Sequence, residues 1–251
     1  MTLIPGAEPW TATGDGVGIL VLHGFTGSPK SVTPWGRAMA EQGWTVSVPL
    51  LPGHGTRWQD MNLTTWQDWY HEAERALRDL RSTCDTVFVM GLSMGGSLTL
   101  RLAEQHGDAI RGIALVNPAV HTERIDRFLL PVLQHVISGF PGISNDIAKP
   151  DQDEGAYDRI PLKAAHSLSQ MWRDVKENLP SITMPVLLFR STQDHVVEPS
   201  NSAHILANVA STDVTEVVLA DSYHVATLDY DADIITRDSI AFVRRLAPTT
   251  P

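Results

Sequence analysis

Residues 86–100, TVFVMGLSMGGSLTL, predict the fold of this chain. They begin with a short apolar run at residues 86–90, typical of a buried strand, and lead into a helical stretch at residues 97–105. Between the two lies GLSMGG, residues 91–96, a Gly-x-Ser-x-Gly pattern at a sharp strand-to-helix turn. Glycines two positions from the serine keep side chains out of the tight crossing. The stretch therefore indicates a nucleophile elbow that presents Ser93 at the carboxyl end of its strand.

Similar apolar runs recur along the chain and predict a parallel sheet. Each run is short and continuous, which suits a strand buried on both faces, and amphipathic stretches such as residues 65–80 separate most of them. The further runs are residues 17–22, 45–50, 112–116, 185–189 and 214–219. This alternation predicts an α/β protein with a mostly parallel central sheet flanked by helices.

Residues 121–179 interrupt the alternation, and we interpret them as a cap insertion with its return to the core. Residues 1–120 and 180–251 are expected to form the core, in one continuous globular unit. Within the insertion, Pro131 is expected to open a helix that Gly139 and Pro141–Gly142 close. The apolar residues expected on one face of that helix are Leu133, Val136, Ile137 and Phe140. This face is expected to pack on the core, to line the entry of a hydrophobic substrate, or to do both.

Composition and charge restrict the classes of partner. The chain has 251 residues and a formal net charge of −10, which argues against nucleic acid because phosphates are held by a surplus of Lys and Arg. Cys84 is the single cysteine, so no disulfide forms within the chain, and no Cys and His cluster has metal-ligand spacing. No basic-then-apolar leader and no apolar run of about 18 residues is present. We therefore expect a cytoplasmic protein without stable membrane insertion.

A serine nucleophile requires a base, and the base requires an acid that holds its tautomer. In this fold the chain order is serine, acid, histidine. His224 directly follows the last predicted strand and is the expected general base, whereas His204 lies in a predicted helix, residues 200–210. Asp194, in the loop after the strand at residues 185–189, is the expected acid.

Other carboxylates and histidines are expected to have structural roles. Closeness along the chain is no guide to a triad built from separate strands, which disfavours the rival acids near the histidine, Asp221, Asp229 and Asp231. His23 and His54 stand in glycine-containing loops. Both are expected to fix these loops by hydrogen bonds rather than to act in catalysis.

A tetrahedral oxyanion requires preorganised N–H donors. One is expected from Met94, the residue after the nucleophile, and the other from HGFTG, residues 23–27, which follows the first predicted strand. The backbone N–H of Phe25 is the expected second donor. Its phenyl ring is also expected to line the acyl site.

Taken together, the motifs resemble those of the small bacterial monoacylglycerol lipases and related carboxylesterases of the α/β-hydrolase family. The resemblance is carried by HGFTG at 23–27, PLLPGHGT at 49–56, GLSMGG at 91–96, QDHVV at 193–197 and SYHVATLDYD at 222–231. These motifs occur in matching order over almost the whole chain. The triad that the resemblance implies agrees with the one reached from the residues.

The resemblance implies hydrolysis of carboxylic esters, above all of monoacylglycerol to glycerol and a free fatty acid through an acyl-enzyme. It implies an apolar acyl tunnel under the cap and a polar corner for the glycerol hydroxyls, with neither cofactor nor metal. Residues 143–150 are similar to the family's cap segment, and Glu154 would be the glycerol-binding carboxylate. Ile143, Asn145 and Phe25 complete the implied substrate site. The partner would be a small lipid ester, with at most transient contact with lipid aggregates.

Three alternatives remain open at this point. A general short- to medium-chain carboxylesterase would share the triad and lack the glycerol corner. A carbon–carbon bond hydrolase or a cofactor-free haloperoxidase shares the fold and the elbow, although the flanking motifs fit these enzymes less well. A non-catalytic ligand-binding protein of the same fold is disfavoured by the intact set of Ser93, Asp194 and His224.

Overall fold

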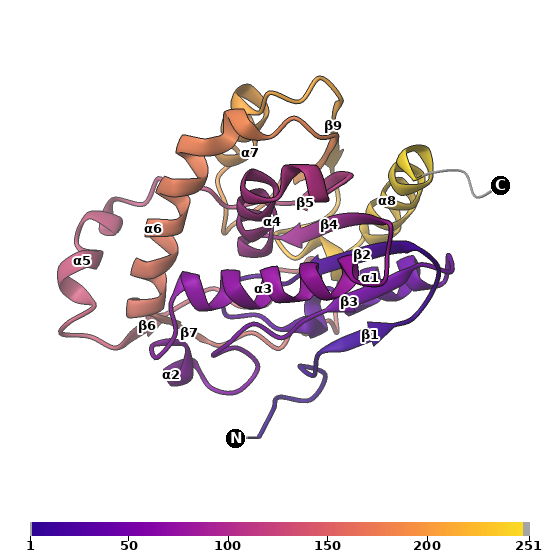
Figure 1. Cartoon of the computed structure of the whole chain (residues 1–251). Helices are drawn as coiled ribbons and strands as arrows, with labels where there is room; N and C mark the ends of the chain where they lie inside the picture. The colour runs from indigo at the N-terminus through magenta and orange to yellow at the C-terminus, as the bar shows by residue number, and fades with distance from the viewer. Residues whose placement is uncertain (1, 248–251) are drawn as a thin grey trace.

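A seven-stranded sheet forms the centre of the molecule (Figure 1). The computed structural model describes residues 2–247, except for the side chains of residues 126 and 127. The sheet has the order β1-β3-β2-β4-β5-β8-β9, and only the pairing of β1 with β3 is antiparallel. The strands are β1 Trp10–Ala12, β2 Val17–Leu22, β3 Thr45–Val48, β4 Thr86–Leu92, β5 Gly112–Val116, β8 Val186–Ser191 and β9 Val214–Leu219. All six predicted strands are confirmed; β1, which has three residues at the edge, was not predicted.

Helices cover both faces of this sheet. They are α1 Thr33–Ala40, α2 Trp58–Met61, α3 Trp66–Arg81, α4 Met94–Gln105, α5 Leu130–Leu133, α6 Leu162–Asn178, α7 Ser200–Asn208 and α8 Ala232–Leu246. One buried cluster joins α3, α4, α6 and α7 to one face, and a second joins α1 and α8 to the other. Alternate residues of β2 divide between them, with Leu20 in the first and Ile19 in the second. No helix within residues 2–247 is long and apolar enough to cross a membrane.

Helix α3 shows why the amphipathic stretches between strands become helices. Thr65 caps its first turn, and the Asp68 carboxylate accepts the Thr65 backbone N–H at 2.8 Å in return. Trp69, Ala73 and Leu77 recur on the face that packs into the first cluster. The helix prediction for residues 65–80 is confirmed.

Pro131 lies in the first turn of a helix as expected, but the predicted extension of that helix to about Phe140 was wrong. The structure has only the short helix α5, followed by turns and by β6, Gly139–Pro141, which pairs with β7, Arg159–Pro161. The Nδ2 of Asn62 donates to the carbonyl of Ser138 at 2.6 Å, and a Cβ on Gly139 would lie 2.8 Å from the Trp58 ring. These contacts with α2 and its C-terminal end direct the chain away from a helix.

The insertion places apolar side chains in solvent rather than on the core. The predicted apolar face does not form, and Val136 and Phe140 are 79% and 55% exposed. Figure 1 shows α5, β6 and β7 projecting beyond one end of the sheet. Helix α6 then returns to the core, where Leu168 and Met171 are buried in the first cluster. The division into core and cap stays a prediction, and residues 1 and 248–251 of the core ranges lie outside the described residues.

Phe88 is the side chain with which we test the packing of the sheet. It is fully buried on β4, and its ring meets the edge of Phe242 at a centroid distance of 6.2 Å. Phe88→Ala should lower the free energy of unfolding by about 3–5 kcal/mol through loss of burial and the cavity left behind. The matched change at an exposed position, Phe140→Ala, should cost less than about 1 kcal/mol. Urea denaturation followed by tryptophan fluorescence measures both, and equal losses would contradict this account of the core.

Candidate active site

Ser93 lies at the junction of β4 and α4 in a backbone conformation that few residues adopt. Its φ is 56° and its ψ −117°, within the positive-φ region that disfavours side chains. A Cβ on Gly95 would lie 2.1 Å from the carbonyl oxygen of Leu22, and one on Gly91 would lie 2.2 Å from the carbonyl oxygen of Gly95. Both glycines are therefore required for the crossing that turns Ser93 out of the strand, as the motif predicts.

His224 and Asp194 form a buried hydrogen-bonded pair. The Nδ1 of His224 lies 2.7 Å from Oδ2 of Asp194, and the other carboxylate oxygen accepts the backbone N–H groups of Val196 and Val197 at 2.8 Å each. These bonds fix the tautomer of His224 with Nε2 free of the proton. The carboxylates of two rival acids, Asp229 and Asp231, are engaged elsewhere. Asp229 accepts four backbone N–H groups and Asp231 accepts that of Asp221.

The charges around His224 favour its protonated form. Burial by itself lowers the pKa of the imidazole, but the negative charge and the hydrogen bond of Asp194 outweigh it, so that the pKa lies above 6.5. Glu154 and Asp146 act in the same direction. Burial by itself raises the pKa of Asp194, yet the attraction of His224 and the hydrogen bonds bring it below its ordinary value. The pair thus keeps the carboxylate charged and raises the basicity of the imidazole.

Ser93 and His224 are both attached to the end of β5. The backbone N–H of Ser93 donates to the carbonyl of Val116 at 2.9 Å, and the Nδ2 of the next residue, Asn117, donates to the carbonyl of His224 at 2.8 Å. Among the residues that the structure describes, neither Ser93 Oγ nor His224 Nε2 has a hydrogen-bond partner. The structure therefore brings the two residues to the same end of the sheet without bonding them to each other. Such contacts often tighten only when substrate binds.

The loop after β2 lies directly beside Ser93. A Cβ on Gly24 would be 3.4 Å from the Cβ of Ser93. Within residues 2–247 the backbone N–H groups of Phe25 and of Met94, the first residue of α4, donate to no protein acceptor. Two N–H donors thus remain available near the serine, which is the arrangement that an oxyanion requires. Their role stays a prediction.

His23 holds this loop in place. Its Nε2 accepts the backbone N–H of Leu51 at 3.2 Å, so the proton is on Nδ1, which donates to the carbonyl of Gly24 at 3.0 Å. Burial lowers the pKa of His23 to about 4, which keeps it neutral. His54 packs edge to face against it at 5.0 Å between ring centroids, and burial also lowers its pKa. Both histidines have the surroundings expected of loop-fixing residues.

Two of the implied substrate-site residues, Asn145 and Glu154, bond each other beside the loop after β2. The backbone N–H of Asn145 donates to Glu154 Oε1 at 2.9 Å, and that of Glu154 donates to Asn145 Oδ1 at the same distance. The second oxygen, Oε2, would lie 3.6 Å from a Cβ on Gly27, in the loop after β2. Burial raises the pKa of Glu154. Ile143, two residues before Asn145, is 53% exposed.

Two residues of the site were missed by the reading of the sequence. Asn117 is 2% exposed with a φ of 44°, and it joins the ends of β5, β8 and β9 through Ser191 and His224. Asn117 is a polar residue that directly follows an apolar strand. A polar residue after a strand was also the signal that identified Asp194, so the sequence could have indicated Asn117. Asp146 contacts His195 and His224 from the insertion. No sequence signal connects it with them.

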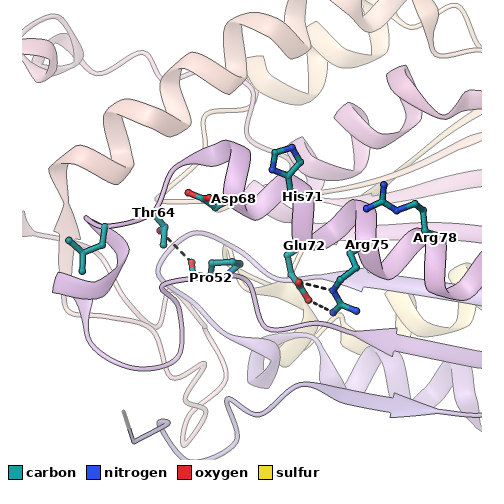
Figure 2. Close-up of a pocket in the computed structure, with 8 residues that line it drawn as sticks. Pro52, Thr64, Asp68, His71, Glu72, Arg75 and Arg78 are labelled. Atoms are coloured by element: carbon teal, nitrogen blue, oxygen red, sulfur yellow. Dashed lines mark hydrogen bonds and ion pairs between the residues drawn. The ribbon is translucent and has the colours of Figure 1, made fainter.

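A separate surface pocket lies along α3 (Figure 2). None of its lining residues belongs to the candidate triad, and two of them, Glu72 and Arg75, form an ion pair. The lining residues are Pro52, Leu63, Thr64, Asp68, His71, Glu72, Arg75 and Arg78. We do not assign the catalytic chemistry to this pocket.

Comparisons with known proteins agree with this geometry. The family described as serine aminopeptidase, S33, matches residues 17–231. A thermostable monoacylglycerol lipase from Bacillus sp. strain H-257 is 40% identical over 98% of this chain and 97% of its own length. A carboxylesterase from Bacillus subtilis strain 168 is 28% identical over 95% and 97%, respectively. A solved structure from the metagenome-derived lipolytic enzymes LipS and LipT has a TM-score of 0.94 at 38% identity, over 97% of this chain and 100% of that one. These similarities confirm the predicted α/β-hydrolase fold.

A fluorophosphonate probe, which reacts with activated serine hydroxyls, tests the candidate triad. It should label Ser93 at a rate that falls as the pH is lowered through the pKa of His224, because only the neutral imidazole accepts the serine proton. Since that pKa lies above 6.5, the half-maximal rate is expected above pH 6.5. Asp194→Asn should lower the rate by roughly 10⁴-fold.

Mass spectrometry of the intact protein measures this labelling, and Ser93→Ala is the control without a nucleophile. Labelling of Ser93→Ala at the wild-type rate would contradict the assignment. So would a rate that does not change between about pH 5 and pH 8, where a histidine titrates.

Proposed function

Because the chain belongs to the serine aminopeptidase, S33, family, we propose that it is a serine hydrolase that cleaves carboxylic esters, with monoacylglycerol as its preferred substrate. The hydrogen-bonded Asp194–His224 pair, at the same end of the sheet as the elbow that carries Ser93, supports hydrolysis most directly. Two relatives that match over nearly the full length, a monoacylglycerol lipase and a carboxylesterase, support esters as the substrate class.

In the proposed mechanism Ser93 Oγ attacks the ester carbonyl while His224 Nε2 accepts its proton. The oxyanion that forms accepts hydrogen bonds from the backbone N–H groups of Phe25 and Met94. His224 then protonates the leaving alcohol, and an acyl-enzyme remains on Ser93. Water, deprotonated by His224, releases the fatty acid by the same route. Asp194 stabilises the imidazolium in both halves of the reaction.

The choice of monoacylglycerol rests on Glu154 and on the relative named as a monoacylglycerol lipase. Glu154 is close to the loop after β2, and Asn145 occupies one of its oxygens, which leaves Oε2 to accept hydrogen bonds from a diol. The glyceryl leaving group offers two such hydroxyls, whereas the ethanol of a simple ester offers none. Exposed apolar side chains of the insertion, Phe140 and Ile143 among them, suit an acyl chain or contact with lipid aggregates.

Hydrolysis of 1-monolauroylglycerol and of ethyl laurate, compared at about pH 8, tests both the proposed ester hydrolysis and the proposed preference for monoacylglycerol. Ser93→Ala should lose nearly all turnover of both esters. Glu154→Gln should lower kcat/KM for the monoacylglycerol by roughly 10- to 100-fold, the loss expected for hydrogen bonds to a charged group. Its rate on ethyl laurate should change by less than about threefold, because that leaving group has no hydroxyl to bind.

The matched control is Asp153→Asn, which removes the neighbouring carboxylate. The Asp153 side chain is 59% exposed and pairs with Lys30, so both rates should stay near those of the wild type. Equal wild-type rates on the two esters, unaffected by Glu154→Gln, would leave a general carboxylesterase. Full activity of Ser93→Ala would overturn the mechanism.

A further inference from the structure

Asp146 comes from the insertion, yet its side chain contacts both loops that carry the candidate acid and base. Its Oδ2 accepts the backbone N–H of His195 at 3.2 Å and that of His224 at 3.1 Å. Its Oδ1 lies 2.8 Å from Nδ1 of His195. Because His195 directly follows Asp194, one carboxylate oxygen links the backbone next to the acid with the backbone of the base.

Bonds on several sides then fix the position of His224. Its N–H donates to Asp146, its carbonyl accepts from Asn117 Nδ2, and its ring bonds Asp194. The carbonyl of Asp146 also accepts the N–H of Val225 at 3.1 Å. Without the Asp146 carboxylate, the backbone N–H groups of His195 and His224 lose their shared acceptor. The insertion then no longer holds Asp194 and His224 at a fixed separation.

The Asp146 carboxylate is also well placed to act through its charge. Its side chain is only 10% exposed, so water screens it weakly. The charged groups that face His224 are Asp194 and, at longer range, Glu154 and Asp146 itself. His195, which bonds Asp146, is 53% exposed and packs against the ring of Tyr223. A positive charge that forms on His224 is thus attracted by three carboxylates.

We propose that Asp146 is a positioning residue of the active site, which holds the loops of Asp194 and His224 at a fixed separation and whose charge stabilises the imidazolium formed during acyl transfer. This role rests on the ester hydrolysis proposed above. It makes the insertion part of the catalytic apparatus.

Asp229 provides a comparison within the same part of the chain. It also joins the insertion to the histidine loop, since it accepts the backbone N–H groups of Ala148 and Lys149 from one and of Tyr223 and Tyr230 from the other. None of these four belongs to His224 or to the residue after Asp194. Asp229 therefore joins the same two segments without contacting the candidate acid or base. It is the control against which a catalytic contribution of Asp146 is measured.

The pH dependence of kcat/KM on a p-nitrophenyl ester distinguishes a catalytic contribution of Asp146 from a purely structural one. Asp146→Asn keeps an oxygen for the two backbone N–H groups and removes the charge. It should lower kcat about 10-fold and move the acidic limb to lower pH by about half a pH unit to one pH unit, because the imidazolium loses a nearby anion. Asp146→Glu keeps the charge and displaces the oxygens. It should lower kcat and leave the limb in place.

The control Asp229→Asn should lower Tm and leave the limb at its wild-type position. All rates are expressed per site titrated with the fluorophosphonate, so that unfolded protein does not enter them. The proposal would be overturned if Asp146→Asn had the acidic limb and the kcat of the wild type. It would also be overturned if Asp229→Asn moved the acidic limb by the same amount as Asp146→Asn. If Asp146→Asn yields no titratable enzyme, a wild-type kcat in Asp146→Glu overturns it instead.

Failure of the proposed function gives a different result. A wild-type protein that hydrolyses no ester would overturn that function alone. The rate of fluorophosphonate labelling, measured over the same pH range, would still report whether Asp146 acts on the reactivity of Ser93.

Discussion

The close crossing of β4, α4 and the end of β2 is the constraint on which the rest of the site depends. At Gly95 the helix passes so near the carbonyl of Leu22 that no side chain fits, and this contact holds Ser93 at a φ of 56°. The same contact places the loop after β2, which carries the backbone N–H of Phe25, beside the serine. A strained residue of this kind persists only when its surroundings determine it completely. Here both strands and the helix contribute.

The parallel arrangement of the sheet brings the remaining functional residues to the same place. Strands β2, β4, β5, β8 and β9 all end at one edge, so the loops that follow them converge there, although they are far apart along the chain. Asn117, at the end of β5, ties these loops together through bonds to Ser191 and His224. The result is a buried polar network with its partners supplied mainly by backbone groups, which is the condition under which such groups are tolerated inside a protein.

The insertion has two distinct surfaces. Toward the core, Asp146 accepts the backbone N–H of His224, and Asn145 and Glu154 bond each other. Ala148 and Lys149 donate their backbone N–H groups to Asp229, which follows the histidine loop. Toward solvent it exposes large apolar side chains that no described part of the chain covers. A segment of this composition is costly for a monomer to expose, which is consistent with a role in contact with apolar substrate. The inner surface bonds the histidine loop, whereas the outer one exposes the apolar side chains that we propose for substrate contact.

Local patterns in the sequence determined the central fold and the candidate triad. Six apolar runs marked six strands, and the glycines around Ser93 marked the elbow, because a buried strand and a tight crossing each demand particular residue types within a few positions. Asp194 was found because polar residues after parallel strands meet at one edge. The helix expected to continue from Pro131 to about Phe140 ends at Leu133, since Asn62 and β7 offered hydrogen bonds that local propensity does not contain. The role of Asp146 could likewise not be predicted, because its side chain contacts residues about 50 and 80 positions away along the chain. Only the tertiary structure decides which distant backbone groups a side chain meets, since sequence periodicity records the burial of a residue and not the identity of its partners.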